Sequence, residues 1–188
     1  PAFPNIQQSI DASFIEVQQT LSIYMLSFAG MILWHGALSD ALGRRNVILA
    51  SLAVFAVASL GCAAAHSIEY LWAFRILQGL SSGAGVVVGR AIIRDVYSGP
   101  DAARLLSLVT MLFAIAPAIA PIIGGFIVQW LDWRAIFLFM FAYTVLLFWL
   151  CYKRLPETLP LEARQPFNMR ELWGNYRQIL GSRRFHLK

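Results

Sequence analysis

Residues 105–131 read LLSLVTMLFAIAPAIAPIIGGFIVQWL, a stretch without a single charged side chain. The hydrocarbon core of a bilayer is about 30 Å thick and is crossed by a helix of about 20 apolar residues. Lipid offers the backbone no hydrogen bonds, so a spanning segment satisfies its own N–H and C=O groups as a helix. This stretch therefore predicts a transmembrane helix.

Four more stretches have the same character. Residues 17–34, 47–65 and 135–152 carry no charge, and residues 70–89 carry only Arg75. Of all 188 residues, 59 % are apolar and 13 % are charged, whereas soluble domains average about 45–50 % and about 25 %. The sequence predicts an all-α polytopic membrane protein with five complete spans.

The basic residues are distributed unequally between the two sides of these spans. The predicted connections are residues 35–46, 66–69, 90–104 and 132–134. Of the 15 Lys and Arg residues, all but Arg75 and Arg134 fall in the first connection, the third or the tail. The positive-inside rule then places the first and third connections and the tail in the cytoplasm. Orientation accounts for the net charge of +5, and we expect no nucleic-acid partner.

The two ends of the chain differ from the spans. Residues 1–16 are interpreted as the end of a preceding helix and an external loop, so that residues 1–155 form the transmembrane bundle. Residues 156–188 are interpreted as the start of a central cytoplasmic loop. From Asn168, with Glu171 three positions later as a capping box, an amphipathic helix is predicted to lie on the membrane surface. A solvated linker with chance periodicity remains the alternative.

The connection between the first two complete spans has a distinctive pattern, GALSDALGRR over residues 36–45. Gly36 is expected to let helices approach closely, and Gly43 to permit a tight turn. Asp40 lies at the membrane edge, where a carboxylate is normally paired, and Arg44 and Arg45 follow it. The residues by themselves are compatible with an ordinary polar hairpin.

This connection resembles the signature loop between helices 2 and 3 of the major facilitator superfamily. The matching positions are Gly36, Leu38, Asp40, Gly43, Arg44 and Arg45. Ala41 departs from the pattern, since a basic residue is common there. The resemblance implies a conformational switch, and we expect Asp40, Arg44 and Asp95 to form a charge cluster that latches one state.

Two further segments resemble motifs of drug:proton antiporters in that superfamily. The first is Arg75, Gln78 and Gly79, which matches the helix 4 motif, with small residues following. A mid-helix arginine costs about 2.5–3.5 kcal/mol to insert, so we expect it to face a polar cavity or a partner. Snorkelling of Arg75 toward the outer interface is the alternative.

The second segment, APAIAPIIGG over residues 116–125, resembles the helix 5 antiporter motif. Pro121, Gly124 and Gly125 match directly, Pro117 is an additional proline, and Ala116 and Ala120 replace two glycines. Small residues four apart let helices pack closely, and proline permits a bend. In the family this face meets the opposite half of the transporter. A plain packing face without a gating role remains possible on the residues alone.

The whole chain looks most like the Bcr/CflA drug-resistance branch. The resemblance implies the N-terminal six-helix bundle of a twelve-helix transporter, with helix 1 largely missing. It also implies export of small amphipathic molecules in exchange for protons, in a bacterial inner membrane, with the proton gradient as energy source and no cofactor. Partners would be the bilayer, the substrate, protons and the missing C-terminal half. The proton-binding acid is expected before Pro1 or in the missing half.

The resemblance also suggests substrate contacts. Family geometry turns helices 2, 4 and 5 inward, and the candidate lining residues are Leu21, Tyr24, Met25, Met111 and Ala114. Each of them is equally compatible with ordinary core packing.

Two other classes of function are a membrane receptor module and an integral membrane enzyme. A non-transporting receptor or assembly module on the same half-fold is the main alternative. An enzyme is not expected, because His35, His66 and His186 are scattered over predicted connections and the tail, without metal-ligand spacing. Cys62 and Cys151 lie inside apolar runs and lack partners for metal or disulfide chemistry.

Overall fold

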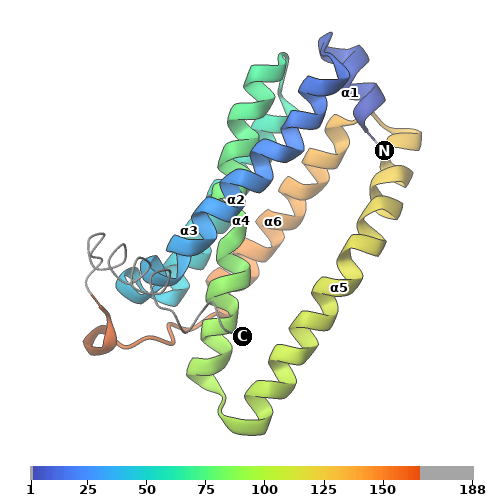
Figure 1. Ribbon diagram of the computed structural model, residues 1–188. Coiled ribbons are helices and arrows are strands. Elements are labelled where there is room, and N and C mark those ends of the chain that lie inside the picture. The colour runs from blue at the N-terminus through green and yellow to red at the C-terminus, as the bar shows by residue number, and fades with distance from the viewer. Residues whose placement is uncertain (1, 166–188) are drawn as a thin grey trace, which may run out of the picture.

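The computed structural model describes residues 2–165, and every regular element in that part of the chain is helical (Figure 1). The helices are α1 (Phe3–Ile10), α2 (Phe14–Leu42), α3 (Arg44–Ala63), α4 (Ile68–Val96), α5 (Gly99–Trp130) and α6 (Arg134–Arg154), followed by a 3₁₀ turn at Leu161–Ala163. The last five α-helices are long and apolar enough to cross a membrane. The predicted five spans are thereby confirmed.

The connections are shorter than the sequence suggested. α2 runs to Leu42, and only Gly43 separates it from α3, so the predicted loop 35–46 is wrong. The predicted loop 90–104 is wrong too, because α4 continues to Val96 and α5 begins at Gly99. Polar and charged residues at these positions were interpreted as loop. They instead extend the helices beyond the hydrocarbon, where charged side chains meet water and headgroups.

Packing is centred on α4, which lies against both α2 and α3, while α3 also packs on α6. Among the glycines, the closest approach to the backbone of another helix is at Gly79 on α4, where an added Cβ would lie 2.5 Å from the carbonyl oxygen of Tyr24 on α2. The expectation that Gly36 allows the close approach is wrong. A Cβ on Gly36 would meet only Val87, at an ordinary 3.7 Å.

The end of the bundle away from Gly43 is closed by α1 and by the α3–α4 and α5–α6 connections (Figure 1). The core there contains Leu71 of α4, Val17 of α2 and Trp133, all with no exposed surface. Ser13 caps α2 in a reciprocal capping box with Glu16, which satisfies backbone N–H groups at the helix start.

α5 differs from the other long helices. It stands to one side of the bundle (Figure 1), makes only sparse contacts with α4 and α6, and has no buried residue. The amphipathic helix predicted from Asn168 lies outside the described residues, and so does most of the predicted loop region 156–188.

Candidate functional site

The α2–α3 hairpin depends on the backbone of a single residue. Gly43 has φ 96° and ψ 149°, a conformation that is open to glycine and strained for other residues by about 1–3 kcal/mol. Its N–H donates to the carbonyl of Ser39, which ends α2, and α3 begins at the next residue. We call this end of the bundle, with Gly43, Asp40 and Asp95, the hairpin end.

Arg44 joins two carboxylates from two helices at the hairpin end. Its Nη1 donates to Asp40 Oδ1 on α2 and to the Ser39 hydroxyl, and its Nε donates to Asp95 Oδ2 on α4 at 3.1 Å. Only 8 % of Arg44 is exposed. Because a planar guanidinium presents several donors in a fixed arrangement, one side chain fastens α3 to both neighbours. The structure thus brings together Asp40, Arg44 and Asp95, the three members of the expected charge cluster.

The segment after α6 adds contacts to this cluster that sequence reasoning did not anticipate. Glu157 Oε1 accepts a hydrogen bond from the backbone N–H of Arg44 at 2.9 Å, at the start of α3. The Thr158 hydroxyl donates to Asp95 Oδ2 at 3.1 Å, and the N–H of Gln165 donates to the carbonyl of Asp40 at 3.1 Å. A carboxylate suits a helix N-terminus, where unpaired N–H groups and the helix dipole favour negative charge. No local pattern in the sequence indicates these contacts.

The remaining hairpin residues serve packing and attachment. Arg45 donates from Nε to the carbonyl of Leu155 at 2.9 Å and from Nη2 to the carbonyl of Tyr152 at 2.8 Å, and its guanidinium lies over the Tyr152 ring. These bonds tie the end of α6 to the start of α3. Leu38 packs against the small core formed by Val47, Ala84 and Val88.

Arg75 occupies a second polar site, inside the bundle. Its Nη1 donates to Gln78 Oε1 at 2.9 Å, and its guanidinium stacks over the Tyr24 ring at 4.5 Å. Gln78 has no exposed surface and donates onward to the Ser59 hydroxyl at 2.7 Å. Arg75 therefore has partners within the bundle, as expected, and does not reach the outer interface by snorkelling. Nε of Arg75 is buried and has no hydrogen-bond partner within residues 2–165.

The helix 5 motif lies on α5 without a packing partner in the described structure. Pro117 and Pro121 are both inside the helix. Ala116 and Ala120 are exposed, Gly124 is partly exposed, and an added Cβ on Gly125 would meet nothing within 4 Å. The role of this face stays a prediction.

The candidate substrate-lining residues do not share one environment. Tyr24 packs between α2 and α4, where its hydroxyl donates to Ser82 Oγ at 3.2 Å. Leu21 and Met25 are exposed on α2. Met111 and Ala114 line a shallow hollow on α5 with three neighbours of the same helix. The structure thus does not assemble them into one site.

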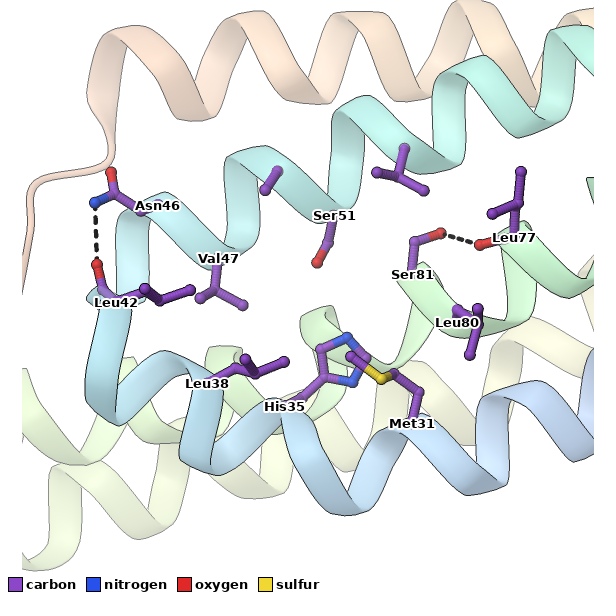
Figure 2. Close-up of a pocket in the computed structure, with 12 residues that line it drawn as sticks. Met31, His35, Leu38, Leu42, Asn46, Val47, Ser51, Leu77, Leu80 and Ser81 are labelled. Carbon is purple, nitrogen blue, oxygen red and sulfur yellow. Dashed lines mark hydrogen bonds between the residues drawn. The ribbon is translucent and has the colours of Figure 1, made fainter. Parts of the chain in front are cut away.

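Among the residues that sequence reasoning placed in a connection, His35 is deeply buried. It lies inside α2 (Figure 2) and is 1 % exposed. The apolar run ends at Trp34, so the sequence did not indicate that α2 continues past His35. No cluster of metal-ligating side chains occurs within residues 2–165.

The five membrane-length helices, of which α2, α3 and α4 share the ion pairs of Arg44, define a multi-pass integral membrane protein. A sequence profile of the Major Facilitator Superfamily matches residues 1–186, and the chain belongs to that family. Members of this family are transporters and not enzymes.

Several curated relatives match most of the chain. An uncharacterized MFS-type transporter, YdgK, from Bacillus subtilis is 40 % identical over 88 % of the chain and 42 % of its own length. A bicyclomycin resistance protein homolog from Haemophilus influenzae is 33 % identical over 94 % and 44 %. Multidrug resistance protein D from Escherichia coli is 29 % identical over 99 % and 46 %. The chain thus spans less than half the length of these relatives.

A solved structure shows the same fold. The human organic anion transporter MFSD10 superposes with a TM-score of 0.69 over 88 % of this chain and 40 % of that one, at 24 % identity. The fold class expected from the sequence, an all-α N-terminal bundle of the major facilitator type, is confirmed.

Proposed function

We propose that this chain is the N-terminal half of a secondary transporter that exports drugs or other small amphipathic molecules in exchange for protons. Relatives named for bicyclomycin and multidrug resistance cover nearly the whole chain, which supports the substrate class. The observation that carries the mechanism is the placement of Arg44 between Asp40 and Asp95. In alternating access, two bundles rock around a site near the membrane midplane.

The charge cluster suits such a motion because it holds the hairpin ends of α2, α3 and α4 as one rigid unit. Its ion pairs are partly buried, since the side chains of Arg44 and Asp95 are 10 % and 23 % exposed. Removing one partner of such a pair leaves the other charge poorly compensated. The cluster therefore stabilises one arrangement of the hairpin, and it latches one state of the transporter.

Arg75 has a different role in this proposal: it sets the electrostatic potential of the substrate cavity of the transporter. Its unpaired Nε leaves one donor available to an acceptor outside residues 2–165. A carboxylate there would bind and release the transported proton, and Arg75 would favour its charged form. The central parts of the described spans contain no Asp or Glu.

The uncovered surface of α5 supports the proposed partner, the remaining part of the same transporter. The small-residue face at 116, 120 and 124 would meet that part and seal the closed state against leakage. The hairpin end, the α4–α5 connection and the tail would lie in the cytoplasm, and the membrane would be the bacterial inner membrane. The energy source would be the proton gradient, without a cofactor.

The test uses the full-length gene in a bacterial strain that lacks its main efflux pumps. Cells expressing it are expected to accumulate less ethidium, and an uncoupler should abolish the difference. Asp40→Asn is expected to lower the initial efflux rate about tenfold, equivalent to about 1.4 kcal/mol, with an unchanged amount of protein in the membrane. Full efflux by this variant would refute the latch.

The matched control is Asp101→Asn, which removes an exposed carboxylate at the start of α5 and should leave efflux unchanged. Equal losses in both variants would indicate a general need for negative charge at this end. The main alternative weighed from the sequence, a non-transporting receptor or assembly module, has no specific observation in its favour. It predicts no uncoupler-sensitive change in ethidium accumulation.

A further inference from the structure

The chain does not leave the bundle where α6 ends. Residues 155–165 run across the hairpin end (Figure 1), with prolines at positions 156 and 160 and with the 3₁₀ turn Leu161–Ala163 as their only regular structure. Proline lacks an N–H group and does not continue a helix, so the two prolines keep this segment out of α6. We call residues 155–165 the strap.

The strap contacts all three helices of the charge cluster. Glu157 accepts a hydrogen bond from the first N–H group of α3 at 2.9 Å. The Thr158 hydroxyl donates to the Asp95 carboxylate on α4, and the N–H of Gln165 donates to the carbonyl of Asp40 on α2, both at 3.1 Å. The strap therefore forms a second layer of contacts over the charge cluster.

Glu157 supplies the helix cap that α3 lacks. Arg44, the first residue of α3, follows Gly43, and α3 has no side-chain cap of its own. N–H groups in the first turn have no acceptor within their helix, and the helix dipole favours a carboxylate at that end. Glu157 also pairs with Arg164 of the strap at 3.5 Å. An added Cβ on Gly43 would collide with both side chains, so this pair lies directly against the turn of the hairpin.

The strap is held mainly by polar contacts. None of residues 155–165 is buried, and Leu161 is 73 % exposed. A single hydrogen bond contributes little net stability, and segments with few buried apolar contacts open before the rest of a fold. Loss of a strap contact should therefore loosen the charge cluster while the helices beneath it stay packed.

We propose that the strap holds the latch closed and that Glu157 is a positioning residue, which acts through Arg44. By binding the N–H of Arg44, Glu157 fixes the start of α3 and thereby the place of the guanidinium between Asp40 and Asp95. This inference rests on the proposed function and deepens it, because it names the segment that controls the charge cluster.

Hydrogen–deuterium exchange of the purified full-length protein in detergent, resolved to single residues, measures the attachment of the strap. The amide of Arg44 has no acceptor in its own helix, so its protection reports the bond to Glu157. Glu157→Ala should speed exchange of this amide about fivefold, the effect of one hydrogen bond. Glu157→Gln keeps a side-chain carbonyl as acceptor and should change the exchange less. Unchanged exchange in Glu157→Ala would overturn the proposal.

The matched control is Glu162→Ala in the same segment. Glu162 is exposed and makes no hydrogen bond or ion pair with any part of residues 2–165. This variant should leave the exchange of the Arg44 amide unchanged. Equal acceleration in Glu162→Ala and Glu157→Ala would trace the protection to the charge of the strap as a whole, and Glu157 would lose its positioning role.

Ethidium efflux by the full-length protein then tests whether Glu157 acts through the latch. Glu157→Ala should lower the initial efflux rate about fivefold, with an unchanged unfolding temperature. If both residues act on one latch, Asp40→Asn/Glu157→Ala should lose no more than the about tenfold expected of Asp40→Asn alone, because coupled residues are not additive. A multiplied loss of about fiftyfold would show independent effects and would contradict the positioning role.

The two measurements separate this inference from the proposed function, because exchange requires no transport. Faster exchange at Arg44 in Glu157→Ala, in a protein that exports no ethidium, would support the strap and refute the proposed function. Equal protection of this amide in all variants of an ethidium exporter would refute the strap alone.

Discussion

α4 and α5 are neighbours in sequence and both are long enough to cross a membrane, yet they differ in how they pack. α5 is the more apolar of the two and has no buried residue. α4 contains Arg75 and several polar side chains, yet eight of its residues are buried: Ile68, Leu71, Gln78, Gly79, Ser81, Gly83, Ala84 and Val88. Five of these eight are glycine, alanine, serine or glutamine.

The difference shows that hydropathy and packing are separate properties of a membrane helix. Apolar side chains are as well solvated by lipid as by each other. Apolarity therefore favours insertion of a helix into the membrane but does not favour its association with another helix. Small residues let backbones approach, and polar residues gain hydrogen bonds across helices. α4 has both on one surface. α5 also has small residues, at 116, 120 and 124, but nothing within residues 2–165 covers them.

The largest expected effect on stability is that of replacing Gly79 by leucine. Its Cβ would lie 2.5 Å from the Tyr24 carbonyl oxygen and 2.7 Å from Ser27 Cβ, and the backbone cannot move away as a flexible side chain can. Overpacking typically destabilises by about 1–3 kcal/mol and occasionally more, and Gly79→Leu should lie at or above the upper end. The measurement is the unfolding temperature of the purified full-length protein in detergent.

Gly125→Leu makes the same change on α5, where an added Cβ meets nothing within 4 Å. It should lower the unfolding temperature far less than Gly79→Leu. If the two variants lost stability equally, the surface of α5 at Gly125 would be as tightly packed in the full-length protein as the α2–α4 crossing. The difference between α4 and α5 would then hold only within residues 2–165.

A smaller effect is expected from leucine at Gln78, which tests polar rather than steric packing. Gln78 is fully buried and bonds both Ser59 and Arg75, so Gln78→Leu leaves a hydroxyl and a cation without those partners. The expected loss is about 2 kcal/mol. Gln129→Leu on the exposed surface of α5 should be neutral. A neutral Gln78→Leu would mean that Arg75 finds another acceptor.

Much of this architecture was predictable because a membrane span is encoded by the hydropathy of consecutive residues. The five spans and their order follow from runs of apolar residues whose solvent is lipid. A partner for Asp40 was predictable because a carboxylate at the membrane edge is normally paired and two arginines follow it closely in the sequence. Arg75 required a partner because an isolated cation in a span is costly, although its actual partners, Gln78 and Tyr24, were not identified.

What sequence reasoning missed depends on tertiary contacts or on polar residues that continue a helix. Glu157 reaches the start of α3 across 113 positions, and no local pattern encodes that contact. His35 was assigned to a loop because a polar residue after Trp34 resembled the end of a span. Its burial depends on the neighbouring α4, where an added Cβ at Gly83 would come within 3.1 Å of its ring.

The smallest expected effects come from one substitution made on both helices, alanine to glycine. Ala120→Gly on exposed α5 changes only helix propensity, about 0.5–1 kcal/mol. Ala84→Gly on α4 carries the same penalty and also removes a methyl group from a site that is 1 % exposed, which adds about 0.8 kcal/mol. The unfolding temperature of the full-length protein should therefore fall further for Ala84→Gly.

Comparing the changes in unfolding temperature of these two variants shows how position 120 is packed, whichever variant is milder. If Ala120→Gly is the milder variant, the methyl at position 120 lies in lipid or in a loosely packed contact, as the described structure has it. If Ala120→Gly instead raises the unfolding temperature, a second helix approaches closely enough to gain from the missing methyl. That is the behaviour expected of a small-residue interface, because the related antiporter motif has glycine at this position. The two helices would then use the same packing principle, α4 against helices within residues 2–165 and α5 against a partner outside them.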